Sequence, residues 1–292
     1  MAWRDVAFQY DGSFQGFLCC VYESYVHKEF PIAFSGDEEF CSLYEVRWVV
    51  TEPQHAKRVY DSLLRRSRAA ADVVRRGFLT CLPDREMHLY ALIRKLYQEG
   101  AAFLRNYADP VYAPVAKALR HMNGELEKLR GFVRFSDYSG VLGAEIEPKN
   151  QVLPLLRRHF CDRYANEAFF IYDRTHRELL VYANRHARIL HVDCLQLALP
   201  GDEEVAFRRL WKRFYETVAI RERHNPRCQN TFMPKRYRGT MTEFLPDDFE
   251  ARQCAVSPTD NPGAFPAPGA PDGISAPETP PRSGPSAAGS AP

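Results

Sequence analysis

The stretch PLLRRHFCDRYANEAFFIYDRTHRELLVY, residues 154–182, decides the fold class, because a helical pattern stands directly before two strand patterns. Pro154 suits the first turn of a helix, and apolar side chains recur after it at helical spacing. Residues 168–172 and 178–182 have the apolar, β-branched and aromatic composition of strands, with a polar segment between them. We therefore predict a helix followed by a β-hairpin that turns around residues 173–176.

The same alternation of strands and helices extends to both sides of this stretch. Asp11-Gly12-Ser13 is a turn sequence between a strand pattern and a helical pattern, and Gly131 is expected to end a long helical region. Further predicted strands cover residues 6–10, 44–50, 132–135 and 141–147, and further helices cover residues 14–25, 53–68, much of 70–130, and 202–223.

Strands interleaved with pairs of helices predict an α+β fold with a mixed or antiparallel sheet. No Pro, Gly or Ser linker interrupts the chain before residue 254, so residues 1–254 are expected to form a single compact body with two lobes. Residues 255–292 hold ten of the 21 prolines and five of the 16 glycines, mixed with Ala and Ser. This composition cannot bury enough apolar surface to fold, so we predict a disordered tail.

Charge is distributed unevenly along the chain. The 292 residues carry a net charge of +2, but the tail contributes −2 and residues 1–254 therefore carry +4. Residues 205–240, which we call the basic segment, hold ten Lys and Arg against two Glu. A block this one-sided favours a polyanionic partner, and nucleic acid is the leading candidate.

The open alternative is that acidic groups elsewhere in the fold neutralise the basic segment. The groups considered for this role are Asp37-Glu38-Glu39 and the pair Glu145 and Glu147. Aromatic residues also lie within the segment. Leu210, Phe214 and Val218 share one helical stripe and are predicted to be core residues. Tyr237 lies in a stretch rich in Pro, Arg and Gly, where its ring could stack on a base.

Sequence motifs for bound cofactors and metals are absent. No Gly-x-x-x-x-Gly-Lys or Gly-x-Gly-x-x-Gly loop occurs, and the eight cysteines form no Cys-x-x-Cys pair. His186, His191 and Cys194 lack the fourth ligand and the paired spacing of a structural zinc site. We therefore expect neither a metal nor a cofactor. Since no segment has the length and hydropathy of a signal or membrane span, a cytoplasmic location is expected.

Five motifs in order resemble a bacterial family of uncharacterised proteins assigned to DNA metabolism and DNA repair. The first is YDGSFQGFL at residues 10–18, and the others span residues 124–135, 154–163, 171–177 and 211–237. The resemblance covers roughly residues 6–245. It implies that members are encoded beside a cysteine-rich radical S-adenosylmethionine protein. It also implies that similar domains are fused to uracil-DNA glycosylase domains.

The charge and the resemblance together predict a DNA-binding accessory protein that works with a radical S-adenosylmethionine partner. Residues expected to contact phosphate are Arg221, Arg223, Lys235, Arg236 and Arg238, and those expected at base edges are Asn225 and Gln229. Two alternatives stay open. One is an adaptor that docks the partner protein. The other is a DNA-processing enzyme, glycosylase-like or nuclease-like, whose acid–base candidates are Asp11, Glu125, His159 and Asp173.

Overall fold

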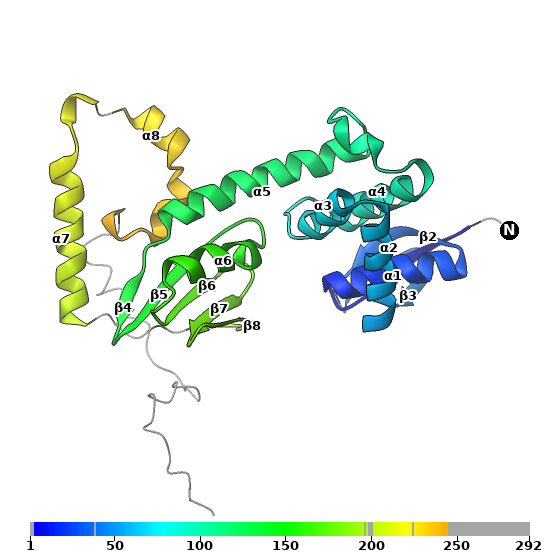
Figure 1. Cartoon of the computed structure of the whole chain (residues 1–292), viewed down its shortest axis with the longest axis horizontal. Coiled ribbons are helices and arrows are strands. Elements are labelled where there is room, and N and C mark those ends of the chain that lie inside the picture. Colours follow the sequence, from blue (N-terminus) through cyan, green and yellow to red (C-terminus); the bar gives the residue numbers. More distant parts are fainter. Residues whose placement is uncertain (1–2, 38, 196, 198–200, 224, 245–292) are drawn as a thin grey trace, which may run out of the picture. The chain divides into compact units, whose positions relative to one another are not determined.

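Figure 1 shows the fold, a computed structural model that describes residues 3–37, 39–195, 197, 201–223 and 225–244. These residues belong to one compact unit, which runs from residue 1 to residue 247. The predicted α+β class is confirmed, since helices accompany a parallel three-stranded sheet and a mixed five-stranded sheet. The tail predicted over residues 255–292 lies outside the described residues. Within them, no helix combines the length and hydropathy needed to cross a membrane.

The first sheet has the order β2-β1-β3, with both neighbours parallel to the central strand. Its strands are β1 (Arg4–Gln9), β2 (Glu29–Ser35) and β3 (Val46–Trp48). Strands at β1 and β3 were predicted, but β2 was missed, and a mixed or antiparallel sheet was expected rather than a wholly parallel one. Pro31 weakens the strand pattern of β2, and it is tolerated because an edge strand can present a residue without an N–H to solvent.

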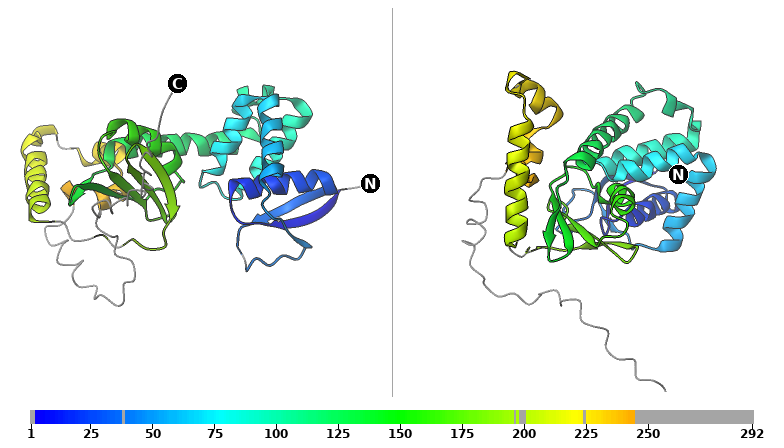
Figure 2. Two further views of the ribbon diagram at one scale, coloured as in Figure 1. Left: turned by 60° about the horizontal axis from the view of Figure 1, so that its bottom comes forward. Right: turned by 60° about the vertical axis from the view of Figure 1, so that its left-hand side comes forward.

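Helix α1 (Phe14–His27) follows β1 through the turn that the sequence predicts, and it packs on the first sheet (Figure 2). The Ser13 hydroxyl caps this helix by accepting a hydrogen bond from the Gly16 N–H at 2.9 Å. Gly16 is required here because a Cβ atom at its position would lie 2.3 Å from an Asp11 carboxylate oxygen. The turn and the start of α1 are therefore fixed together.

Three further helices contribute to the first core. They are α2 (Pro53–Arg66), α3 (Arg68–Phe78) and α4 (Arg85–Glu99), followed by the 3-10 turn η1 (Ala102–Arg105). Their apolar stripes meet those of α1, and Leu63, Val74 and Leu92 are completely buried there. Ser67 alone separates α2 from α3, and its side chain caps α3.

Helix α5 (Tyr112–Phe132) contributes to both hydrophobic cores of the unit. Val115 packs in the first core, whereas Met122, Leu126 and Leu129 pack in the second. The predicted end of this helix at Gly131 is confirmed to within one residue, since the helix ends at Phe132, but the strand predicted at residues 132–135 is wrong, because the next strand begins at Ser136. One glycine costs a helix about 1 kcal/mol, which the buried contacts of the preceding turns can offset.

The second sheet has the order β4-β5-β6-β7-β8 and surrounds the predicted hairpin. Its strands are β4 (Ser136–Tyr138), β5 (Val141–Ile146), β6 (Phe169–Asp173), β7 (Glu178–Ala183) and β8 (His186–His191). The β6–β7 hairpin is confirmed, with Phe169 opposite Tyr182. β5 and β6 are parallel, and α6 (Leu153–Arg163) is the helix that connects them. It lies against β7 and β8 (Figure 1). Strand β8 was not predicted.

The C-terminal elements form a less buried layer. They are α7 (Asp202–Val218), η2 (Arg221–Arg223), α8 (Pro226–Phe232), η3 (Lys235–Thr240) and η4 (Thr242–Phe244). The predicted core role of Leu210, Phe214 and Val218 is wrong, since these side chains are 62%, 53% and 59% exposed. Polar contacts hold α7 instead. Arg208 donates to the Ser136 hydroxyl, and the Trp211 indole N–H donates to Glu243.

Candidate functional site

Glu125 is the centre of a buried polar network at one edge of the second sheet. Its side chain projects from α5 and is completely buried. The carboxylate accepts hydrogen bonds from the backbone N–H groups of Lys149 and Asn150, which follow β5, at 3.1 and 2.9 Å. The Asn150 side chain donates at 2.6 Å and the Arg236 guanidinium at 2.8 Å. Residues far apart in the sequence therefore meet on one carboxylate.

These contacts fix the charge state of Glu125. Burial alone would raise its pKa, but the hydrogen bonds from Asn150 and Lys149 and the charge of Arg236 lower that pKa below its ordinary value. A carboxyl group held ionised in this way is a poor proton donor. We therefore assign Glu125 a positioning role, in which it fixes Arg236 and the segment that follows β5.

Asp173 and His176 form a second arrangement, at the end of β6. Asp173 is completely buried, and one carboxylate oxygen accepts the N–H groups of Thr175 and His176 at 2.9 and 3.1 Å. The other oxygen lies 2.7 Å from Nδ1 of His176. Nε2 of this ring has no hydrogen-bond partner among the described residues. A buried Asp thus orients a His whose other ring nitrogen is unused, as general acid–base catalysis requires.

The topology explains why the two arrangements are neighbours. Parallel strands end at the same sheet edge, and the register places Ile146 at the end of β5 opposite Asp173 at the end of β6. Burial alone would lower the pKa of His176, but Asp173, Glu178 and Glu125 raise it above its ordinary value. Burial also raises the pKa of Glu178, one of whose oxygens is buried without a partner among the described residues. The carboxyl ends of parallel strands are common ligand positions.

The other two acid–base candidates lie elsewhere. Asp11 accepts a hydrogen bond from the Ser13 N–H at 2.9 Å and another from the Thr51 hydroxyl at 2.7 Å, so it organises the turn before α1. His159 lies on α6, where burial and the charges of Arg130 and Arg163 lower its pKa. Neither shares a hydrogen bond or ion pair with Glu125 or Asp173 in the described part of the chain. The four candidates therefore do not form a single catalytic group.

Several residues expected to bind nucleic acid make contacts within the protein. Tyr237 is buried against Phe132, so its ring is not exposed for stacking. Arg238 donates to the Asn230 side chain and to the Met233 carbonyl. The Asn225 side chain caps α8, and Gln229 donates to the Tyr215 hydroxyl at 3.1 Å. Arg236 keeps partial exposure beside Glu125.

Other cations of the basic segment are exposed and unpaired. Arg223 and Lys235 belong to the predicted set, whereas the side chain of Arg221 lies outside the described residues. Arg209, Arg213 and Arg227 are also exposed, and the sequence prediction did not single them out. None of these five has an ion-pair partner within the part of the chain that the structure describes. In the sequence, only the one-sided charge of the whole segment indicated these residues, and no motif did.

The acidic groups considered as neutralising partners are not paired with the basic segment in the described structure. Glu147 pairs with Arg174 at 3.1 Å. Asp37 accepts the N–H of Glu39, and Glu38 lies outside the described residues. Of the arginines in the segment, Arg208 pairs with Glu204 and Arg236 pairs with Glu125, and both carboxylates lie outside the segment. Much of its positive charge therefore faces solvent.

Among the described residues, no group of three or more His, Cys, Asp and Glu is placed to hold a metal ion. His186 and His191 stand at opposite ends of β8, and His191 contacts Asp193 at 3.4 Å.

A family model described as a domain of unknown function, DUF4130, matches residues 83–243. The matched region contains Glu125, Asp173, His176 and the basic segment. No curated protein and no solved structure matches the chain.

Proposed function

The chain belongs to the DUF4130 family, a domain of unknown function, and from its own residues we propose that it binds DNA through the basic segment. The exposed, unpaired cations Arg209, Arg213, Arg223, Arg227 and Lys235 carry this proposal. Clustered cations without internal partners are the usual means of neutralising phosphates, and binding releases the counterions that surround the nucleic acid.

Exposed aromatic side chains favour single-stranded over duplex DNA. Trp211 and Phe214 stack on each other with ring centroids 5.6 Å apart, and both are exposed. Phe207 and Phe232 are exposed as well. Unpaired bases can stack on such rings, whereas the bases of a duplex are already stacked on each other. Unpaired cations and exposed rings on the same segment suit a surface for single strands.

Fluorescence anisotropy with a labelled single strand and the corresponding duplex tests the proposal. We expect tighter binding of the single strand at low salt. The logarithm of affinity should fall by about 0.7 per neutralised phosphate for each unit increase in log salt concentration. The double variant R209E/R213E should bind about tenfold more weakly, because two phosphate contacts become repulsive.

The matched control is R105E/R188E, which makes the same charge change at two exposed arginines outside the basic segment. It should retain most of the wild-type affinity, because a general effect of net charge is weaker than loss of local contacts. Absence of binding to either form of DNA at low salt, or equal loss in both double variants, contradicts the proposal.

A docking role for a radical S-adenosylmethionine protein is the second proposal, and the exposed apolar side of α7 favours it. Leu210, Phe214 and Val218 present a contiguous stripe of the kind found at protein interfaces. Co-expression with a radical S-adenosylmethionine protein, followed by purification after nuclease treatment, separates the two roles. A complex that survives nuclease supports docking, and a complex that dissociates supports a DNA bridge.

The Asp173–His176 pair supports one further candidate, an acid–base role on DNA. Incubation with oligonucleotides that carry uracil or an abasic site, with and without Mg²⁺, tests it. H176Q keeps a polar side chain of similar length but cannot transfer protons at neutral pH. Product formed by the wild-type protein and lost in H176Q supports catalysis. Unchanged substrate under both conditions argues for binding alone.

A further inference from the structure

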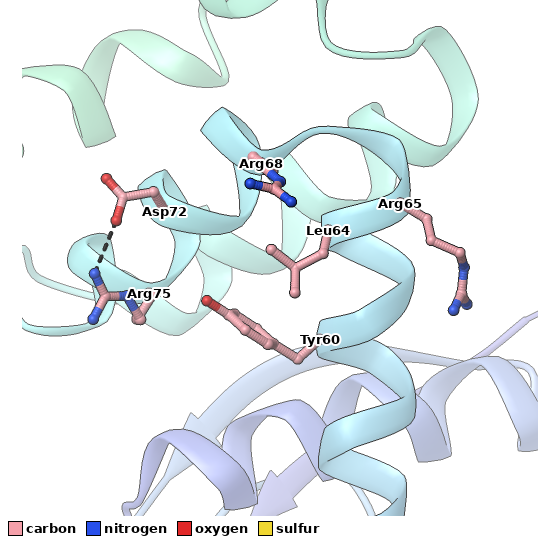
Figure 3. A pocket seen from close by; sticks show the side chains of 6 residues that line it. All are labelled: Tyr60, Leu64, Arg65, Arg68, Asp72 and Arg75. Atoms are coloured by element: carbon pink, nitrogen blue, oxygen red, sulfur yellow. Dashed lines mark hydrogen bonds and ion pairs between the residues drawn. The ribbon is translucent and has the colours of Figure 1, made fainter.

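A second basic surface lies on α2 and α3, mostly outside the region that the family model matches. Residues 53–78 hold seven Lys and Arg against two Asp. An open cavity of about 590 Å³ lies between the two helices and is lined by Tyr60, Leu64, Arg65, Arg68, Asp72 and Arg75. Figure 3 shows Tyr60, Arg68 and Arg75 around this space, which we call the arginine cavity.

Positive charge prevails in the arginine cavity. Its carboxylate, Asp72, pairs with Arg75 at 2.9 Å and with Arg76 at 3.9 Å. Arg65 and Arg68 are exposed, and neither has an ion-pair partner among the described residues. Helix α3 also begins at Arg68, so the positive end of its dipole adds to the free guanidinium group of that residue. An anion entering the cavity would meet the unpaired cation of Arg68 at the start of this helix.

A second cavity of about 320 Å³ lies beside α2, and Arg65 lines both cavities. We call it the tyrosine cavity, because Tyr22, Tyr25 and Tyr97 contribute to its wall. Figure 3 shows Arg65 extending from the side of α2 opposite to Tyr60. Arg58 lies 5.8 Å above the Tyr22 ring. His55 stacks on the Tyr22 ring and Arg66 lies over the Tyr97 ring, so the exposed ring of Tyr25 is the one suited to stacking with a nucleobase.

We infer that these cavities form a binding track for single-stranded nucleic acid, with phosphates in the arginine cavity and a base in the tyrosine cavity. The two cavities lie on different sides of α2, and Arg65 stands at the end of that helix between them. A flexible single strand can bend around a helix end, whereas a duplex is too stiff and too wide. The inference shares its ligand class with the proposed function but depends on different residues.

Photo-crosslinking of the full chain locates the base. An oligothymidylate that carries 5-iodouracil crosslinks to aromatic side chains close to the halogenated base, and mass spectrometry identifies the peptides. We expect crosslinked peptides that contain Tyr22, Tyr25 or Tyr97, in addition to any from the basic segment. R65E/R68E should lose the tyrosine crosslinks and bind a single strand about tenfold more weakly at low salt. An oligouridylate arm distinguishes RNA from DNA as the preferred strand.

Two further variants separate this track from the basic segment. R105E/R188E should keep the tyrosine crosslinks, and Y25L should weaken them while leaving the charge unchanged. Crosslinks confined to residues 205–240, together with equal affinity of R65E/R68E and R105E/R188E, overturn the inference but leave the proposed function intact. Loss of affinity in R65E/R68E, with none in R209E/R213E, supports the inference and contradicts the proposed function. If R65E/R68E fails to fold, R65Q/R68Q supplies the same comparison without adding negative charge.

Discussion

At the scale of single residues, Glu125 combines complete burial with a negative charge. Its donors come from the segment after β5 and from η3, so the carboxylate joins both of these elements to α5. Replacing it by Ala leaves Asn150, two backbone N–H groups and Arg236 without their acceptor. We expect E125A to lower the free energy of unfolding by about 2–3 kcal/mol.

Urea denaturation measures this change, with E127A as the matched control. Glu127 lies on the exposed side of the same helix and pairs with Arg130 at 2.6 Å. Surface pairs of this kind contribute about 0.5 kcal/mol, so E127A should have little effect. Similar stability of the two variants would contradict the structural role of Glu125.

His176 gives the second prediction at this scale, a pH dependence. Because Asp173 raises its pKa in the folded protein, the folded state binds this proton more tightly than the unfolded state. The resulting stabilisation is present in full below about pH 6.5, the ordinary pKa of His, and is lost as the pH rises through the folded pKa.

An NMR titration of the His176 ring and urea denaturation across this pH range measure the two effects. In D173N the amide oxygen can still accept the turn N–H groups, but the negative charge is gone. Burial then dominates, and the pKa of His176 should fall below its ordinary value. An unchanged pKa in D173N would show that Asp173 does not control this ring.

The sequence could predict only some of the residues in the candidate site, and the reasons are physical. Glu125 and Asp173 lie in two of the motifs that carry the family resemblance, and the structure places them near each other. The pairing of Glu125 with Arg236 spans 111 positions, so no local pattern could indicate it. His176 was assigned to a turn, since a His three residues after an Asp has no distinctive spacing. Asp11 and His159 had suitable chemistry but different neighbours.

At the scale of elements, α7 shows how an amphipathic pattern can mislead. Its apolar stripe predicted burial, but periodicity identifies only which side chains share a face, not whether another element covers it. The described fold leaves that face open. Strand β2 was missed for a related reason, because pairing at a sheet edge can include a proline that breaks the strand pattern.

The exposure of α7 leads to a stability prediction. L210Q should change the free energy of unfolding by less than about 0.5 kcal/mol, because the side chain is already in water. L126A, on the buried face of α5, should cost about 2–5 kcal/mol by leaving a cavity. Urea denaturation at two protein concentrations checks both. A large, concentration-dependent loss in L210Q would instead show that α7 is covered by a second copy.

At the scale of the whole molecule, the two basic surfaces proposed to bind a single strand differ in their chemistry. The basic segment has exposed rings and unpaired cations on helices and turns, whereas α2 and α3 provide cavities. The net charge of +2 conceals both, because acidic residues elsewhere balance the total. Charge per segment was predictable from sequence. The cavities could not be predicted in this way, because they depend on how α2 packs against the neighbouring helices.

Two sites for one strand predict a particular dependence on oligonucleotide length. A strand long enough to reach both sites binds the second one intramolecularly, so its affinity should exceed that of a strand confined to one site. A single site of this type covers about 4–16 nucleotides. A longer strand also binds more tightly simply because it offers more binding positions. We therefore expect an oligothymidylate of about 40 nucleotides to bind more tightly than one of about 8 nucleotides by a factor that exceeds the ratio of their numbers of binding positions. Both R65E/R68E and R209E/R213E should remove this excess, and R105E/R188E should retain it. Anisotropy titrations at fixed salt measure the ratio. An excess that persists in both site variants would mean that the two surfaces do not share a strand.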